Sequence, residues 1–415
     1  MEFEPYRIMA IEPLPFPSRK ERRKALGEAS YNVFHLRSRM ITIDLVSDSG
    51  TGTMSVKQWR NLLMADEAFS FQKSYDDFVA KAKELTGFEF ILPVHQARAA
   101  EHILFKLIIR KGTRVIANHL FATTREHLIR CGAEIFELPR EGSGDINLKL
   151  LKKRLKKDSV VILSVTSNHH GGQVVALDNI EMVSSIVKGR GLLIIDGCRF
   201  AENSYLESKR LKIDIKEAIR RTFAASDIFY LSTKKDLLTN IGGMVGVRDK
   251  RLFIRLNEMV LAHEGYPSHG GLAGRDLAAI TQSFNEIIDL NYLSFRIEQV
   301  QRLGRSLKTD GVPVHEPFGC HAITIPACDF VPGLPHPGFT GAAKIYLDGG
   351  IRGGVFFEDG EVIRLAIPRR VYTNSQIDYV ARSIISTYRK GRFFKLRPTY
   401  KPDRLSNFLL RFQRG

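Results

Sequence analysis

Short apolar runs alternate with amphipathic stretches between residues 55 and 261. The apolar runs predict buried strands, and these lie at 89–94, 114–118, 134–138, 159–165, 191–195, 228–231 and 244–247. Apolar residues at helical spacing predict helices at 55–63, 74–85, 95–109, 123–131, 148–156, 178–188 and 250–261. This alternation predicts an α/β domain whose mostly parallel sheet is covered by helices on both faces.

The rhythm of the pattern changes after residue 274. One long helix is predicted at 275–307, followed by strands at 322–325 and 361–367, a helix after Pro337 and a helix at 375–388. At the other end, a helix at 20–34 and a strand at 40–46 precede the alternating region. We therefore predict a large domain at 46–290, a smaller α+β domain at 291–415, and an N-terminal segment at 1–45 that packs with the smaller domain.

Composition and charge narrow the class of protein. The chain has 415 residues, 44% of them hydrophobic and 26% charged, as expected of a soluble globular protein. Neither a membrane span, which needs about 20 apolar residues, nor a secretory signal is expected. The four cysteines show no close pairing, which favours a reducing cytoplasm. The net charge of +17 suggests nucleic-acid binding, but the basic residues are dispersed without aromatic interleaving, so no such partner is expected.

Polar and charged residues follow three consecutive predicted strands. Asn168, Asp196 and the group Ser232, Lys234 and Lys235 each lie at the end of an apolar run. Ligands of open α/β sheets bind at the carboxyl ends of strands, where a lysine can act as an amine nucleophile, for example in a Schiff base with pyridoxal phosphate. A carboxylate facing the pyridine nitrogen would keep that cofactor protonated. Alternatively, the lysines form a charged turn, and Asp196 caps a helix or pairs with a neighbouring arginine.

Further candidate ligand groups precede and follow this region. Gln96, Ala97 and Arg98 open a predicted helix directly after a strand, which is a good anion site because the helix start offers free N–H groups. The small hydroxyl and glycine residues at 47–52 can approach a ligand closely or form an ordinary turn. Arg364 lies inside an apolar strand and needs a partner, either a substrate carboxylate or a structural ion pair.

Several ordered motifs carry a family resemblance along the whole chain. They are Glu4–Ile8, Asp48–Thr51, Met54–Ser55, Gln58–Trp59, Asp66–Ala68, His95–Arg98, Gly171–Gln173, Ser232–Asp236, Asn240–Gly243, Gly270–Gly274 and Arg364–Pro368. With these motifs the chain resembles the tryptophanase and tyrosine phenol-lyase family of pyridoxal-phosphate-dependent β-eliminating lyases. The resemblance implies the aspartate-aminotransferase-type fold (fold-type I, with a mostly parallel seven-stranded-type sheet) and a homotetramer or homodimer with shared active sites.

The resemblance also implies roles for individual residues. Lys235 would hold the cofactor covalently and move the α-proton, Asp196 would pair with the pyridine nitrogen, and Arg199 would lie beside it. The implied phosphate ligands are Gln96, Ala97, Arg98 and Ser232, with Phe121 stacked on the ring and Lys234 close to Lys235. The implied ligands of the substrate carboxylate are Ser47, Ser49, Asn168 and Arg364. The implied potassium ligands are Glu67 and the backbone carbonyls of Gly50 and Asn240.

The departures from the family concern the leaving group. The family's acid tyrosine is Phe69 here, a second tyrosine is His269, and the segment 349–360 is short and lacks the arginine that recognises phenol. Phenylalanine has no proton to give, so we expect β-elimination or β-replacement on an L-amino acid other than tyrosine or tryptophan, with His269 as a candidate acid. Transamination, retro-aldol cleavage, γ-elimination or γ-replacement, and a non-catalytic basic binding protein stay as alternatives.

Overall fold

The computed structural model describes residues 3–140 and 142–415, which form two compact units. Unit 1 comprises residues 1–48, 169–172 and 294–415, and unit 2 comprises residues 49–168 and 173–293. The segment 169–172 is therefore an excursion of the chain out of unit 2 into unit 1. None of the described helices is both long and apolar enough to cross a membrane.

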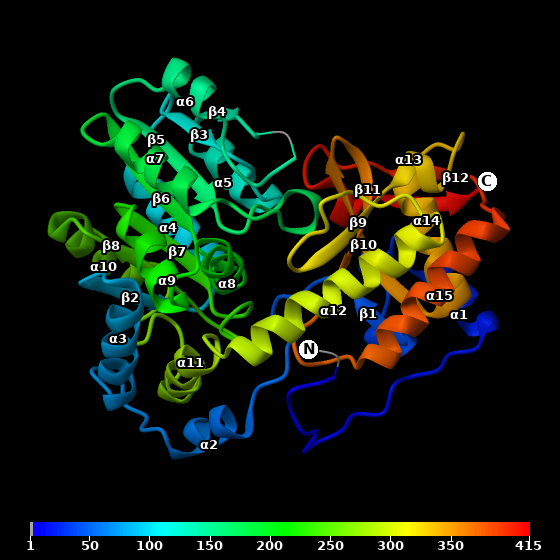
Figure 1. Cartoon of the computed structure of the whole chain (residues 1–415), viewed down its shortest axis with the longest axis horizontal. Coiled ribbons are helices and arrows are strands. Elements are labelled where there is room, and N and C mark those ends of the chain that lie inside the picture. Colours follow the sequence, from blue (N-terminus) through cyan, green and yellow to red (C-terminus); the bar gives the residue numbers. More distant parts are fainter. Residues whose placement is uncertain (1–2, 141) are drawn as a thin grey trace. The chain divides into compact units, whose positions relative to one another are not determined.

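Unit 2 is built on a seven-stranded sheet with the order β2-β8-β7-β6-β5-β3-β4 (Figure 1). Its strands are β2 (Phe90–Val94), β3 (Arg114–Ala117), β4 (Glu134–Glu137), β5 (Ser159–Ser164), β6 (Gly191–Asp196), β7 (Ile228–Ser232) and β8 (Gly243–Val247). All neighbouring pairs from β7 to β4 are parallel, whereas β8 is antiparallel to both β2 and β7. The predicted α/β class with a mostly parallel sheet is confirmed.

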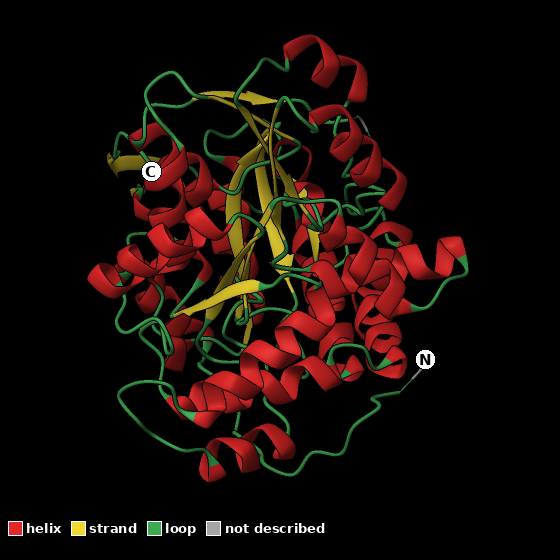
Figure 2. Cartoon of the chain, turned by 90° about the vertical axis from the view of Figure 1, so that its left-hand side faces the viewer, coloured by secondary structure: helices red, strands yellow, loops and turns green. Residues whose placement is uncertain are grey.

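Helices cover the sheet of unit 2, as the red ribbons around the yellow strands in Figure 2 illustrate. They are α2 (Val56–Met64), α3 (Lys73–Thr86), α4 (Ala97–Ile108), α5 (Ala122–Arg130), α6 (Leu148–Arg154), α7 (Leu177–Val187), α8 (Phe200–Leu211), α9 (Ile215–Ala224), α10 (Lys250–His263) and α11 (Gly274–Glu286). Every residue of β5, β7 and β8 is buried. Burial on both faces explains why these strands are continuous apolar runs in the sequence.

Unit 1 contains a four-stranded sheet with the order β1-β10-β11-β9 and a two-stranded ribbon of β12 and β13. Its strands are β1 (Ile43–Leu45), β9 (Ala322–Pro326), β10 (Ile351–Glu358), β11 (Gly360–Ala366), β12 (Leu396–Tyr400) and β13 (Arg411–Arg414). Its helices are α1 (Arg19–Glu28), α12 (Leu290–Thr309), α13 (Ala327–Phe330), α14 (Pro337–Gly349), α15 (Asn374–Lys390) and α16 (Ser406–Leu409). Three short 3₁₀ turns are η1 (Val33–His35), η2 (Ser38–Met40) and η3 (His169–Gly171).

Two predicted helices are wrong in extent. The single helix predicted at 275–307 is divided into α11 and α12, because Asp289 accepts hydrogen bonds from the N–H groups of Asn291 at 2.8 Å and Tyr292 at 3.2 Å and so starts a new helix. The helix predicted at 20–34 ends at Glu28, since Ser30 and Tyr31 follow with left-handed φ values of 49° and 55°. The strand β10 and the helices α8 and α9 were not predicted.

The close approach of β5 and β6 gives a test of the fold. A Cβ atom at Gly191 would lie 2.2 Å from the carbonyl oxygen of Ser159, so Gly191→Ala forces two paired strands apart. We expect a loss of about 1–3 kcal/mol in the free energy of unfolding, measured by urea denaturation. Gly27→Ala is the control, since a Cβ atom there, in the last turn of α1, meets nothing within 4 Å. It should be neutral or stabilising by up to about 1 kcal/mol.

Candidate active site

The start of α4 forms a cradle for an anion in unit 2. β2 ends at Val94, and Gln96 precedes the helix in an extended conformation without capping it through its own side chain. The start of β8 approaches this helix closely, since a Cβ atom at Gly243 would lie 2.6 Å from the nitrogen of Ala97. Glycine therefore keeps the N–H groups at the helix start accessible to a ligand, and the helix dipole favours a negative charge there.

Three cations gather at this cradle. Burial first, and then the charges of Arg98 and Lys235, lower the pKa of Lys234 below that of an exposed lysine. Ser232 is buried at the end of β7, and its hydroxyl accepts a hydrogen bond from the N–H of Lys234 at 3.3 Å. A phosphate group would relieve the mutual repulsion of these cations and accept hydrogen bonds from Ser232 and the helix start.

Asp196 presents a buried carboxylate at the end of β6. Its Oδ1 accepts a hydrogen bond from the N–H of Cys198 at 3.1 Å, and its Oδ2 accepts one from the Ser164 hydroxyl at 3.4 Å. Burial, followed by the nearby carboxylate, raises the pKa of the Cys198 thiol to about 12, so this neighbour stays neutral. A carboxylate held by neutral donors is suited to pairing with a protonated ring nitrogen.

The support of Asp196 was not predicted from the sequence. Ser164 pairs with Asp196 in the register of β5 and β6, and Asn118 in turn accepts a hydrogen bond from the Ser164 N–H at 3.0 Å. Asn118 is fully buried and also donates to the carbonyl oxygen of Ser164 at 3.1 Å. A polar residue that ends an otherwise apolar strand was the available signal for Ser164.

Asn168 and Arg199 come together beside these groups. The guanidinium of Arg199 donates a hydrogen bond to the side-chain oxygen of Asn168 at 3.3 Å, and Arg199 is buried. Phe121 directly precedes α5 and is half-buried. With Lys235 in the turn after β7, these unit 2 residues fit pyridoxal phosphate: the helix start suits its phosphate, Asp196 its ring nitrogen and the lysine amine its aldehyde.

The residues predicted to bind potassium are only partly brought together. The N–H of Gly50 donates to the carbonyl oxygen of Lys234 at 2.7 Å, and a Cβ atom at Gly50 would lie 3.4 Å from the carbonyl oxygen of Asn240. Glu67 is engaged elsewhere, because its carboxylate accepts hydrogen bonds from the N–H at 3.1 Å and the Nε at 2.7 Å of Arg275. The other carboxylate oxygen of Glu67 accepts a hydrogen bond from the N–H of Gly274 at 3.0 Å, so both oxygens face the start of α11.

Phe69 and His269 lie together in an outward-facing aromatic group. The ring of Phe69 lies 5.4 Å from that of Tyr266 and 6.3 Å from that of His269. The side chain of Phe69 is 78% exposed. Phe69, which the resemblance predicts to stand where the family has its acid tyrosine, is therefore a surface residue of this chain and lies next to His269.

The residues predicted to hold the substrate carboxylate are divided between the two units. Arg364 is buried in β11 of unit 1, with its guanidinium 3.8 Å above the ring of Phe356. Ser47 also belongs to unit 1, whereas Ser49 and Asn168 belong to unit 2. The chain passes from one unit to the other directly beside Ser47, Ser49 and Asn168, at 48–49 and 168–169.

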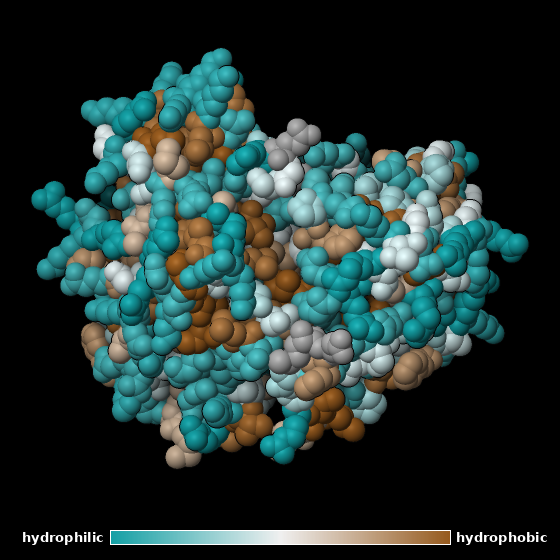
Figure 3. Space-filling view, viewed as in Figure 1, coloured by the Kyte–Doolittle hydropathy of each residue, from teal (hydrophilic) through white to brown (hydrophobic). Residues whose placement is uncertain are grey.

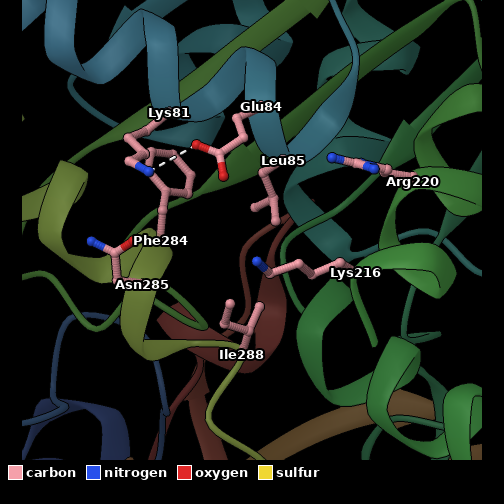
Figure 4. Close-up of a pocket in the computed structure, with 8 residues that line it drawn as sticks. All are labelled: Lys81, Glu84, Leu85, Lys216, Arg220, Phe284, Asn285 and Ile288. Carbon is pink, nitrogen blue, oxygen red and sulfur yellow. Dashed lines mark hydrogen bonds and ion pairs between the residues drawn. The ribbon is translucent and has the colours of Figure 1, made fainter. Parts of the chain in front are cut away.

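The resemblance predicts that Asn407 stands where the family has an aromatic residue or histidine that covers the substrate side chain. Asn407 is buried, and its amide donates to the carbonyl oxygen of Val355 at 3.2 Å, which supports β10. A hollow of unit 2 is lined by an ion pair of Lys81 and Glu84 at 2.8 Å, together with Lys216 and Arg220 (Figure 4). It contains none of the predicted site residues. Figure 3 shows hydrophilic residues over much of one face, with hydrophobic patches among them.

Comparisons with known proteins identify relatives over nearly the full length. A family model described as Beta-eliminating lyase matches residues 44–383. A protein of Aeropyrum pernix named "Probable tryptophanase" is 40% identical over 94% of this chain and 91% of its own. A tryptophanase of Hyphomonas neptunium is 38% identical over 99% of both chains. A tyrosine phenol-lyase of Clostridium tetani is 36% identical over 99% of this chain and 97% of its own.

Solved structures with little sequence identity share the fold. A histidinol-phosphate aminotransferase of Sinorhizobium meliloti, in complex with pyridoxal-5'-phosphate, matches with a TM-score of 0.65 at 13% identity over 91% of this chain and 96% of that chain. A serine palmitoyltransferase of Sphingomonas wittichii matches with a TM-score of 0.63 at 13% identity over 84% of this chain and 88% of that chain. These similarities confirm the predicted fold-type I architecture.

The cationic cradle gives a test that needs no substrate. Inorganic phosphate should raise the melting temperature of the cofactor-free protein, and Arg98→Ala should weaken its binding about 10–100-fold because a charge-assisted hydrogen bond is lost. Thermal shift against phosphate concentration measures both effects. Lys106→Ala is the control, since this exposed cation lies in the last turn of the same helix and should leave phosphate binding unchanged. Equal loss in both variants would contradict the cradle.

Proposed function

Because the chain belongs to the β-eliminating lyase family and is a pyridoxal-phosphate-dependent lyase, we propose that it cleaves or exchanges the Cβ substituent of an L-amino acid other than tyrosine or tryptophan. One observation carries this proposal. The groups that would bind the cofactor, Asp196, Ser232 and Lys235, are present at the strand ends. At position 69, where the resemblance predicts the acid that protonates the leaving group, the chain has a phenylalanine.

The proposed division of labour follows the chemistry of each side chain. Bound pyridoxal phosphate supplies an electron sink for the pair released when the Cα–H bond breaks. The Lys235 amine holds the cofactor aldehyde and moves the proton at Cα, and Asp196 stabilises the positive charge at the ring nitrogen. Arg98, Ser232 and the start of α4 hold the phosphate, which orients the ring and neutralises the cationic cradle.

The substrate carboxylate needs a cationic partner and further hydrogen-bond donors. We assign this role to Arg364, because a planar guanidinium grips a carboxylate through two parallel hydrogen bonds. The Cζ atom of the guanidinium lies 3.8 Å from the centroid of the Phe356 ring, so this ring packs against the guanidinium and helps to hold it in place. Ser47, Ser49 and Asn168 supply the further donors that fix the orientation of Cα.

Phe69 decides the class of leaving group in this proposal. Release of phenol or indole requires protonation of an aromatic ring carbon, a step that needs a positioned acid. Phe69 has no such proton, and His269 beside it, with ring centroids 6.3 Å apart, is the candidate that could give one. A thiolate or halide leaves with less help, so substrates with such a group at Cβ suit this site better.

An oligomer and a potassium ion belong to the same proposal. Apolar side chains lie exposed around α2 and the loop after it, namely Val56, Leu63, Met64, Phe69 and Phe71. A patch of this kind favours burial against a second copy, as a homodimer or homotetramer with shared active sites. The four cysteines, which show no close pairing in the sequence, favour the cytoplasm as the protein's location. Glu67 lies within this patch and would complete, from the partner copy, a potassium site begun by the carbonyls of Gly50 and Asn240.

A substrate panel tests the proposed reaction. The purified holoenzyme should release pyruvate and ammonia from L-amino acids with a thiolate or halide at Cβ, such as S-substituted cysteines and β-chloro-L-alanine. Phenol from tyrosine and indole from tryptophan should form at least about 100-fold more slowly, because the acid step is unsupported. Lys235→Ala should abolish pyruvate release. Phenol or indole at comparable rates, or conversion of the cofactor to pyridoxamine phosphate, would contradict the proposal.

Arg364 offers a second test of substrate binding. Arg364→Lys keeps the charge but loses the bidentate hydrogen bonds to the substrate carboxylate. The kcat/KM for the best substrate of the panel should therefore fall about 10–100-fold, while the cofactor content is unchanged. Steady-state kinetics and the cofactor absorption measure the two quantities. Arg397→Lys, at an exposed position of β12 in the same unit, is the matched control and should keep the wild-type kcat/KM.

A further inference from the structure

A cluster of two histidines and one glutamate lies in unit 1. His170, His315 and Glu358 each offer one ligand atom, and these atoms all lie within 4.8 Å of one another. The Nε2 of His170 is 3.8 Å from the Oε2 of Glu358. The two imidazole rings are nearly parallel, with centroids 3.9 Å apart and an interplanar angle of 16°. Within the described residues, this is the one group of three such side chains with metal-ligand spacing.

Each of the three residues is held by a different segment of unit 1. Glu358 ends β10, and its Oε2 accepts a hydrogen bond from the backbone N–H of His170 at 3.1 Å. The turn that carries His170 is fixed against the residues just before β9 by hydrogen bonds from the N–H of Cys320 to the carbonyl oxygen of Gly172 at 2.9 Å and from the N–H of His321 to that of Gly171 at 3.2 Å. Glu358 therefore belongs to a strand, and the turn with His170 is tied to the residues that precede another strand of the same sheet.

His315 is oriented through its second ring nitrogen. Its backbone N–H donates to the carbonyl oxygen of Thr324 at 3.0 Å, and its Nδ1 lies 3.0 Å from the hydroxyl oxygen of Thr324. Thr324 belongs to β9, next to Arg364 in the register of the sheet. A hydrogen bond at one ring nitrogen fixes the ring and leaves the other nitrogen, Nε2, as the one that can bind an ion, as in many metal sites.

We propose that His170, His315 and Glu358 bind a divalent transition-metal ion of the zinc class. Two imidazole nitrogens and one carboxylate oxygen are the donor set that suits such an ion, and three protein ligands leave a position open for a fourth. In a tetrahedral site with bonds of about 2.1 Å the ligand atoms lie about 3.4 Å apart. Ligand atoms that lie up to 4.8 Å apart here would therefore close by up to about 1.4 Å around an ion, a shift that side-chain rotation can supply.

The site is accessible to an ion. The side chain of His170 is 23% exposed and that of Glu358 is 10% exposed, so the ion can enter from solvent while most of the site stays dry. The metal site does not rest on the proposed reaction, because all three ligands and Thr324 belong to unit 1 and none of them is assigned a step at the cofactor. Failure of the one proposal therefore leaves the other standing.

Equilibrium dialysis of the full-length holoenzyme against Zn²⁺, followed by elemental analysis, tests the site. The wild-type chain should retain about one zinc ion that His170→Ala, His315→Ala and Glu358→Gln each weaken by at least about 100-fold. Thr324→Val, which keeps the side-chain shape, should weaken binding about 10-fold because the ring of His315 loses its orientation. His336→Ala is the matched control: His336 pairs with Glu361 at 3.6 Å in the same unit but lies outside the group of three.

X-ray absorption of the zinc-loaded wild-type protein provides a measurement that no folding defect can affect. A shell of two imidazoles and one carboxylate is expected. Zinc binding that all three ligand variants and the control retain equally, a shell without imidazole, or no retained zinc would each overturn the proposal. The cluster would then be a hydrogen-bonded group that positions the His169–Gly171 turn.

Discussion

Backbone hydrogen bonding between the parallel strands β5, β6 and β7 is the constraint on which the rest of the site depends. In the register of these strands, Ser164 pairs with Asp196, and Asp196 pairs with Tyr230. Tyr230 lies two residues before Ser232. Because parallel strands end at one edge of the sheet, a carboxylate, a hydroxyl and, in the turn after β7, two ammonium groups all follow strands at this edge. A slip of one residue would turn each of these side chains to the opposite face.

The charges at this edge are balanced only with a ligand present. The burial of Lys234, and then the nearby charges of Arg98 and Lys235, lower the pKa of Lys234, and the start of α4 adds the positive end of a dipole. Asp196 supplies the opposite charge and is held by two neutral donors, the Ser164 hydroxyl on the neighbouring strand β5 and the backbone N–H of Cys198 just after β6. A molecule with a phosphate at one end and a protonated ring nitrogen at the other satisfies both needs, which links the electrostatics of the sheet to the chemistry of the family.

The sequence was sufficient for features that depend on local pattern. The parallel sheet was predictable because its strands are buried on both faces and read as apolar runs. The helix α8 was missed because its buried face is polar: Glu202, Asn203 and Ser204 are all buried, so hydrophobic periodicity cannot reveal it. The strand β10 was missed because Gly353 and Gly354 read as a turn, although a Cβ atom at Gly354 would lie 2.7 Å from the ring of Phe356.

Contacts between distant residues were beyond such reasoning, and they carry what distinguishes this chain. The hairpin of β10 and β11 sets Gly354 opposite Arg364, so Phe356 and Glu358 follow on the face that carries Arg364. Glu358 then meets His170, which is 188 residues away along the chain. One strand pair thus presents both the proposed grip for a substrate carboxylate and a ligand of the proposed metal ion. The segment 349–360, which the resemblance predicts to lack the arginine that recognises phenol, thus contributes Glu358 to a polar group that only long-range strand pairing brings together.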